Sequence, residues 1–156
     1  MRPDRVIVGE IRGAEGFDML QAMNSGHDGS LGTIHASGPR EALTRLENIL
    51  DLSGFHLPIR AIRTQIASAI DMIVQVSRMR DGKRRVTGIM EVIGTEGDVI
   101  TAQDLFRYQF ESEQADGKLA GSFISSQLRP HFMSEAEFYG LGIKLHEAMA
   151  APPWRG

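Results

Sequence analysis

The fold is decided by a short apolar run that ends in a carboxylate, Val6-Ile7-Val8-Gly9-Glu10. A continuous apolar run of this length is typical of a strand that is buried on both faces of a parallel sheet. Because ligands of open α/β folds bind at the carboxyl edge of the sheet, the pattern predicts that Glu10 lies at a ligand-binding edge. The alternative interpretation is an ordinary loop acid at the end of a strand, since the motif is short.

A second short strand is expected over residues 31–34, and it ends in His35. If the two strands are parallel neighbours, Glu10 and His35 lie at the same edge of the sheet. In nucleotide hydrolases an acid at this place orients or deprotonates the attacking water, or holds a water bound to Mg²⁺. An imidazole there can hydrogen-bond a γ-phosphate or the attacking water. The alternative for His35 is a ring held by a main-chain carbonyl in a turn.

Helical and strand patterns surround these two strands and indicate an α/β chain. Apolar spacing predicts helices over 14–23, from Pro39 to a stop at Gly54, and from Pro58 to Ile70. The second half is expected to hold strands over 70–77, 86–93 and 99–110, with turns at 81–82, 94–97 and 116–117. Two short helical segments follow Pro130. Since the first half supplies only about two strands of the parallel type, we expect their partner strands to lie upstream, outside this sequence.

Two more polar positions lie close to the first strands. Arg12, two residues after Glu10, is placed to reach a phosphate or an acid across an interface, and a surface ion pair is the alternative. His27 and Asp28 together suggest a metal site, but their spacing matches no common zinc pattern. A turn held by the Asp28 side chain is the favoured interpretation, so no metal ligand is predicted.

The remaining cations fall into two groups. Arg60 and Arg63 share one helix face, which is placed to contact a phosphate or a neighbouring subunit, with a solvated face as the alternative. A second group surrounds the hairpin turn at 81–82. It is best interpreted as a solvated edge, with nucleic acid or anionic lipid as alternatives. Its members are Arg78, Arg80, Lys83, Arg84 and Arg85.

Composition excludes several classes of protein. The 156 residues are 42% hydrophobic and 24% charged, which suits a chain with a buried core. Cysteine is absent, so disulfides, thiolate metal sites and cysteine nucleophiles are excluded. The net charge of −3 disfavours a broadly basic nucleic-acid binder, and no nucleic-acid partner is expected. No apolar run approaches the roughly 18 residues of a membrane span.

The sequence also lacks the loop that cradles nucleotide phosphates, Gly-x-x-x-x-Gly-Lys-Ser/Thr. Its two Gly-Lys pairs, Gly82-Lys83 and Gly117-Lys118, are not followed by Ser or Thr, and neither has the second glycine five positions earlier. A nucleotide bound at the predicted edge would therefore need phosphate contacts from other residues.

These motifs resemble the type II and type IV secretion ATPases. The segment from Arg2 to Gly13 resembles their Walker B motif, and Gln21 to Ala36 resembles their His box. The segments 37–47, 60–71 and 91–94 fit the same family, and the subgroup that they resemble most is the CpaF-type ATPase of tight-adherence (Flp) pili. The resemblance covers about residues 1–130.

The resemblance implies a partial RecA-like P-loop ATPase core followed by a β-hairpin-rich part. Residues 1–130 would be the carboxyl-terminal part of the ATPase domain. Beyond the match, the helical pattern predicts that residues 131–156 form a short helical tail. Glu10 corresponds to the catalytic glutamate, His35 to the His-box histidine near the γ-phosphate, and His27 to a further residue of that box. In the full-length context the family uses ATP and Mg²⁺.

The family also implies an assembly and a location. Its members work as cytoplasmic homohexamers, peripheral at the inner membrane, and drive pilus assembly or secretion through membrane platform proteins. This sequence departs from the family because the Walker A loop, the Asp box and the amino-terminal domain are missing, so the chain alone is not expected to hydrolyse ATP. The alternative function is a non-catalytic interaction module that assembles with ATPase subunits or membrane partners.

Overall fold

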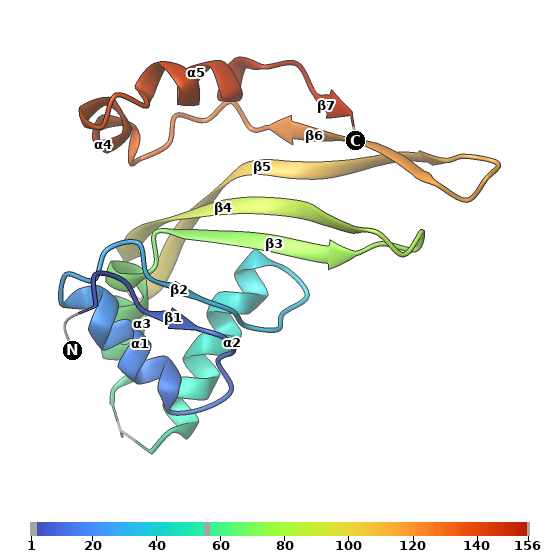
Figure 1. The fold of residues 1–156 in the computed structure, drawn as a ribbon. Helices are drawn as coiled ribbons and strands as arrows, with labels where there is room; N and C mark the ends of the chain where they lie inside the picture. The colour runs from blue at the N-terminus through green and yellow to red at the C-terminus, as the bar shows by residue number, and fades with distance from the viewer. Residues whose placement is uncertain (1–2, 55–56, 156) are drawn as a thin grey trace. The chain divides into compact units, whose positions relative to one another are not determined.

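A computed structural model describes residues 3–54 and 57–155 (Figure 1). Arg2 of the Walker B segment and Gly156 of the tail lie outside the described residues. The elements follow one another as β1 (Ile7–Val8), α1 (Glu15–Asn24), β2 (Leu31–Gly32), α2 (Pro39–Leu52), α3 (Ile59–Ala69), β3 (Met72–Arg78), β4 (Arg84–Glu96), β5 (Val99–Glu113), β6 (Leu119–Ser125), α4 (Met133–Phe138), α5 (Gly142–Ala150) and β7 (Trp154–Arg155).

The chain divides into two compact units, and each is described by itself. The first unit runs through Asp71 and adds Val92–Ala102, and the second joins Met72–Glu91 to the chain from Gln103 onward. The last residues of β4 and the first residues of β5 therefore belong to the first unit. The expected division near residue 130 does not separate them, and that division stays a prediction.

The first unit builds a small parallel sheet on three helices. β1 pairs with β2 in parallel, with Ile7 opposite Leu31 and Val8 opposite Gly32. Helices α1, α2 and α3 pack against one another through apolar stripes, as their sequence periodicity predicts. The buried side chains of this core are Ile11, Met19, Leu20, Leu43, Leu46, Leu50, Ile62 and Ile66.

Close packing joins β2 to helix α1. A Cβ atom built on Gly32 would lie 2.5 Å from the sulfur of Met19 and 3.1 Å from Cδ1 of Ile11. A side chain at this position would therefore push against the helix, so glycine allows β2 to lie close to α1.

The expectation that β1 is buried on both faces is wrong. Ile7 is 76% exposed and its register partner Leu31 is 63% exposed, whereas Val8 is half-buried. The physical reason is that this sheet has only two strands among the described residues and that α1 packs against it at Gly32. The open apolar face is consistent with the expectation of further strands, which stays a prediction.

The second unit contains most of an antiparallel sheet with the strand order β3-β4-β5-β6-β7. The hairpins predicted at 81–82 and 116–117 are confirmed, because β3 pairs with β4 and β5 with β6 around these turns. The turn predicted over 94–97 is displaced, since β4 continues to Glu96. Gly97, with a φ of 60°, takes the left-handed conformation in the turn that follows.

A buried carboxylate fastens the segment before α4 to this sheet. Glu91 on β4 is 2% exposed and accepts hydrogen bonds from Gln103 Nε2 at 2.7 Å, the His131 amide at 2.9 Å and the Phe132 amide at 3.0 Å. Because a buried carboxylate is costly unless its oxygens are hydrogen-bonded, these three donors fix where the chain enters α4.

Candidate functional site

The carboxyl ends of β1 and β2 lie side by side. Beyond the paired strand residues, the Thr33 amide donates to the Val8 carbonyl at 3.2 Å and the Ile11 amide donates to the Thr33 carbonyl at 2.8 Å. The Thr33 hydroxyl adds a hydrogen bond of 2.5 Å to the Gly9 carbonyl. The two chains thus stay together past the end of the sheet, and this pairing positions the polar side chains that follow.

Glu10 and His35 meet at this edge. Glu10 Oε1 lies 3.3 Å from His35 Nε2 and 2.6 Å from Arg12 Nε. The Glu10 side chain is 29% exposed, whereas those of His35 and Arg12 are 81% and 74% exposed. The acid therefore lies at the base of the cluster, with its two basic neighbours facing solvent.

The electrostatics of the cluster keep Glu10 ionised. The hydrogen bond from Arg12 is the main cause that lowers the pKa of Glu10, and the positive charges of Arg12, His35 and Arg45 add to it. Desolvation raises the same pKa but does not outweigh these effects. At neutral pH the carboxylate is consequently a strong hydrogen-bond acceptor and a weak proton acceptor.

A second carboxylate holds the turn that carries Arg12. Glu15, the first residue of α1, accepts hydrogen bonds from the Arg12 amide at 2.5 Å and the Gly13 amide at 2.9 Å. These amide donors, with Arg12 first, lower the pKa of Glu15. Sequence reasoning did not single out Glu15, although an acid in the first turn of a predicted helix is the signal that would have found it.

His27 is held within its own loop. Its Nδ1 lies 3.1 Å from the Ala22 carbonyl and 3.4 Å from the Ser25 hydroxyl, so the ring closes the turn after α1. No group of three His, Cys, Asp or Glu side chains in residues 3–54 and 57–155 could hold a metal ion. A role for His27 near a nucleotide stays a prediction.

Arg60 and Arg63 contact the turn between β4 and β5 instead of the Glu10 cluster. Arg63 makes two hydrogen bonds to the Glu47 carboxylate, at 3.0 and 3.2 Å, and a third of 2.7 Å to the Asp98 carbonyl. Arg60 Nε lies 3.4 Å from Asp98 Oδ1. Both guanidinium groups thus fasten α3 to the first unit's part of the hairpin, and an interface role for either stays a prediction.

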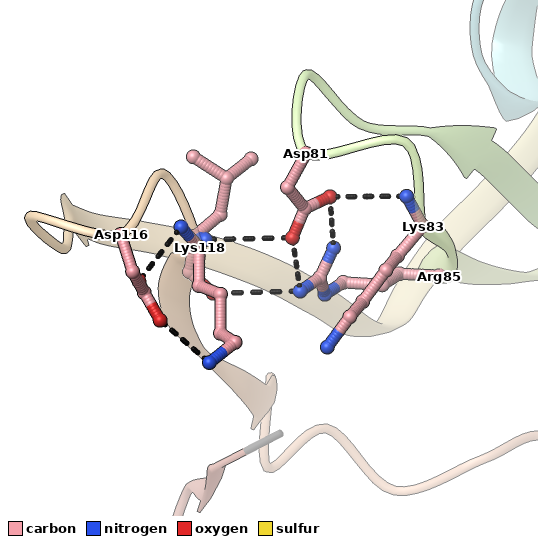
Figure 2. Close-up of polar contacts among 6 residues, drawn as sticks. Asp81, Lys83, Arg85, Asp116 and Lys118 are labelled. Atoms are coloured by element: carbon pink, nitrogen blue, oxygen red, sulfur yellow. Dashed lines mark hydrogen bonds and ion pairs between the residues drawn. The ribbon is translucent and has the colours of Figure 1, made fainter.

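Arg85 and Asp81 at the β3–β4 hairpin form an ion pair with largely buried side chains, which Figure 2 shows. Arg85 donates to both oxygens of Asp81, at 2.9 and 2.7 Å, and the Leu119 amide donates to Asp81 at 3.4 Å. The interpretation of this cluster as a solvated edge is therefore wrong for Arg85, whose side chain is 14% exposed. The cause is Asp81 in the turn, four residues earlier, which faces Arg85 across the end of the β3–β4 hairpin.

The chain is similar to proteins of known secretion and conjugation systems. The family described as Type II/IV secretion system protein matches residues 1–116. A putative conjugal transfer protein of Mycobacterium tuberculosis is 44% identical over 99 residues, which cover 64% of this chain and 28% of that protein. The type IV secretion system protein PtlH of Bordetella pertussis is 38% identical over 94 residues, with 57% and 27% covered.

A solved structure matches the same part of the fold. The VirB11 ATPase from the Brucella suis type IV secretion system, in complex with sulphate, aligns with a TM-score of 0.52 and 30% identity. The alignment covers 57% of this chain and 28% of that chain. The mixed α/β fold with its antiparallel sheet thus matches a fragment of that ATPase, and the chain spans less than a third of the length of these relatives.

Proposed function

Because the chain belongs to the type II/IV secretion system protein family, we propose that it forms the acid- and imidazole-bearing part of the nucleotide site of a secretion or pilus-assembly ATPase. The observation that carries this proposal is the distance of 3.3 Å between Glu10 and His35 at the carboxyl ends of two parallel strands. This edge of a parallel sheet is where α/β proteins bind their ligands.

Each side chain of the cluster has a distinct role in the proposed reaction. Glu10, ionised and hydrogen-bonded, accepts a hydrogen bond from the attacking water and orients it. His35 and Arg12 are exposed and carry the N–H donors that an anionic γ-phosphate requires. Because Arg12 contacts Glu10 Oε1, a phosphate that attracts Arg12 would remove one of the two contacts to this oxygen and leave the carboxylate more available to the water.

The remaining parts of the site come from other residues. The sequence has no phosphate-binding loop, and its described part has no cluster of metal ligands. The Glu10 carboxylate is paired with Arg12 and the Glu15 carboxylate with main-chain amides, so these residues do not make a Mg²⁺ site by themselves. In the proposed enzyme, ATP and Mg²⁺ are therefore held mainly by residues outside this sequence.

The subgroup, the assembly and the location of the proposed ATPase are also part of the proposal. Membership of the CpaF-type subgroup stays a prediction, because the relatives described above carry conjugal-transfer and type IV secretion names. The homohexamer, the membrane platform partners and the peripheral place at the inner membrane are likewise proposed. No helix within the described ranges is long and apolar enough to cross a bilayer.

A second candidate function is a non-catalytic module that assembles with ATPase subunits. The missing phosphate loop and the open apolar face at Ile7 and Leu31 support it. Such a module would bind an ATPase subunit without taking part in catalysis. Changes at Glu10 would then not alter the subunit's rate of ATP hydrolysis.

Phosphate release distinguishes the two functions. The assay uses an assembly that contains this chain and a phosphate-binding loop, on one polypeptide or two. Glu10→Gln is expected to lower turnover by roughly 10²- to 10⁴-fold, the usual contribution of a positioned acid or base, with little change in nucleotide affinity. Glu96→Gln, at an exposed carboxylate on β4, is the matched control. Unchanged turnover in Glu10→Gln would reject the catalytic role and favour the module.

A further inference from the structure

The chain bends between β1 and α1, and packing fixes both ends of this bend. Ile11 is 3% exposed, and its amide donates to the Thr33 carbonyl at 2.8 Å. A Cβ atom built on Gly16 would lie 2.9 Å from Cγ2 of Ile11, so the first turn of α1 lies directly against this buried side chain. Arg12, between these two anchored positions, is exposed.

The Glu15 carboxylate closes the bend. Its Oε1 accepts hydrogen bonds from the Arg12 amide at 2.5 Å and from the Gly13 amide at 2.9 Å. A Cβ atom built on Gly13 would lie 3.3 Å from Glu15 Oε2, so glycine leaves room for the carboxylate beside the main chain. A charged acceptor strengthens both hydrogen bonds. Glu15 therefore sets the direction of the main chain at Arg12.

Arg12 depends on this main-chain support because its side chain is long and mostly exposed. The side chain is 74% exposed, and its Nε lies 2.6 Å from Glu10 Oε1. An exposed arginine gives up much rotamer entropy when it is ordered, and a single exposed ion pair holds it only weakly. The main chain that carries Arg12 consequently determines how often its N–H donors lie beside Glu10.

The two carboxylates act on Arg12 in different ways. Glu10 accepts a hydrogen bond from the guanidinium, whereas Glu15 accepts one from the main-chain amide of the same residue. The hydrogen bond to Glu10 is the main cause that raises the pKa of Arg12, and the negative charges of Glu10 and Glu15 add to it. Glu10 thus contacts the cation itself, and Glu15 holds the backbone from which the cation extends.

We propose that Glu15 is a positioning residue of the nucleotide site, which holds the amides of Arg12 and Gly13 and so directs the Arg12 guanidinium toward Glu10 and the γ-phosphate. The part of this inference that concerns the γ-phosphate rests on the proposed function. The contact between Arg12 and Glu10 is present without a nucleotide. Glu15 is assigned no contact with the reacting atoms, so its effect passes through Arg12.

The pKa of Glu10 tests the inference without ATP. It is followed by NMR of the Glu10 carboxyl carbon during a pH titration of the intact chain. Glu15→Ala removes the acceptor of both amides, so Arg12 leaves Glu10 more often and the pKa of Glu10 rises. Loss of the Glu15 charge alone would lower this pKa, because a nearby negative charge disfavours a second carboxylate. His35 and Arg45, whose charges also lower it, are unchanged.

The direction of the shift therefore separates positioning from charge, and three variants complete the test. Glu15→Gln keeps an oxygen that accepts both amides, so the pKa of Glu10 should not rise. Asp18→Ala removes another exposed acid from the first turn of α1 and should not raise it either. In Arg12→Met, adding Glu15→Ala should cause no further rise. The inference is overturned if Glu15→Ala leaves the pKa of Glu10 unchanged or lowers it, or if the rise persists in Arg12→Met.

ATP turnover connects the inference to the proposed function. In the assembly that contains a phosphate-binding loop, Glu15→Ala is expected to lower kcat by roughly 10- to 10²-fold, the effect of a small misplacement of a catalytic group. Glu15→Gln should restore most of this loss, and Glu15→Ala should add no loss to Arg12→Met.

The two possible failures are distinguishable. Normal turnover in Glu15→Ala, while Glu10→Gln is slow, would overturn the role of Glu15 and leave the proposed function in place. Normal turnover in Glu10→Gln would reject the proposed function together with the role of Glu15 at the γ-phosphate, and the pKa of Glu10 would still show whether Glu15 positions Arg12.

Discussion

Each compact unit of the chain contains an acid that accepts hydrogen bonds from an arginine, but the two clusters differ in how they are enclosed. Asp81 and Arg85 in the second unit have side chains that are 4% and 14% exposed, and main-chain amides complete the shell of Asp81. Glu10 in the first unit has neighbours that are mostly exposed. In the enclosed cluster the Asp81 carboxylate finds its hydrogen-bond donors within the protein. In the open cluster the N–H donors beside Glu10 are available to a ligand.

This difference distinguishes charged residues that stabilise the fold from charged residues that are available to bind a ligand. Removing one partner of a largely buried ion pair is costly, because the other charge stays behind without compensation. An exposed pair contributes little to stability, since water screens it. We therefore expect changes at Asp81 and Arg85 to alter folding, and changes at Glu10 and His35 to alter activity without altering folding.

The largest effect on stability is expected for Arg85→Met. The substitution leaves the Asp81 carboxylate without its guanidinium partner and removes the cation that lies 5.9 Å from the Tyr108 ring centroid. Urea unfolding followed by circular dichroism should show a clear loss of stability. Lys118→Met is the control, because its exposed pair with Asp116 should contribute almost nothing. Equal losses in the two variants would contradict the comparison.

The dependence of the free energy of unfolding on pH, at acidic pH, tests the same pair of Asp81 and Arg85. The hydrogen bonds from Arg85 hold the pKa of Asp81 well below its usual value. A carboxylate with a lowered folded pKa stabilises the protein fully above its unfolded pKa, about 3.9, and this contribution is lost as the pH falls toward the folded value. The wild-type chain should lose more stability below about pH 4 than Asp81→Asn does. Parallel curves would show that Asp81 is not responsible.

A smaller effect is expected for Arg63→Met in the first unit. The substitution removes the bonds to Glu47 and to the Asp98 carbonyl, which hold the β4–β5 turn against α3. Amide hydrogen exchange in this turn should become faster, with little change elsewhere. Arg60→Met is the control, since the Arg60 side chain is mostly exposed and lies 3.4 Å from Asp98. Exchange that is equally fast in both variants would remove the special role of Arg63.

The smallest effect on stability is expected for Glu10→Gln. The open cluster contributes little to folding, so the urea midpoint of this chain should stay within experimental error of the wild type. A loss as large as that of Arg85→Met would mean that Glu10 is a structural residue and would remove the basis of the comparison.

Local patterns were sufficient to predict much of the fold and the meeting of Glu10 with His35. The apolar period of 3.6 residues predicted α2 and α3, and the Asp-Gly turns predicted two hairpins, because these signals act over a few residues. The rule that polar residues at the ends of parallel strands share one edge predicted the 3.3 Å contact in the site.

Contacts between residues far apart in the sequence could not be predicted from these local patterns. Leu119, 38 residues from Asp81, donates its amide to Asp81 and accepts a hydrogen bond from Arg85 at its carbonyl. Glu91 likewise accepts hydrogen bonds from amides about 40 residues away. Hydrophobic periodicity carries no information about such pairs. The exposure of Ile7 was also missed, because an apolar run predicts a buried strand whether or not another part of the described chain covers it.

A double-mutant cycle in ATP turnover tests most directly whether Glu10 and His35 act as one site. The four proteins are the wild type, Glu10→Gln, His35→Asn and the double variant, each in an assembly that contains a phosphate-binding loop. Residues that act as a unit are strongly non-additive, so the double variant should be about as slow as the slower single variant. If the two losses multiply instead, the side chains act independently and the proposed nucleotide site is wrong.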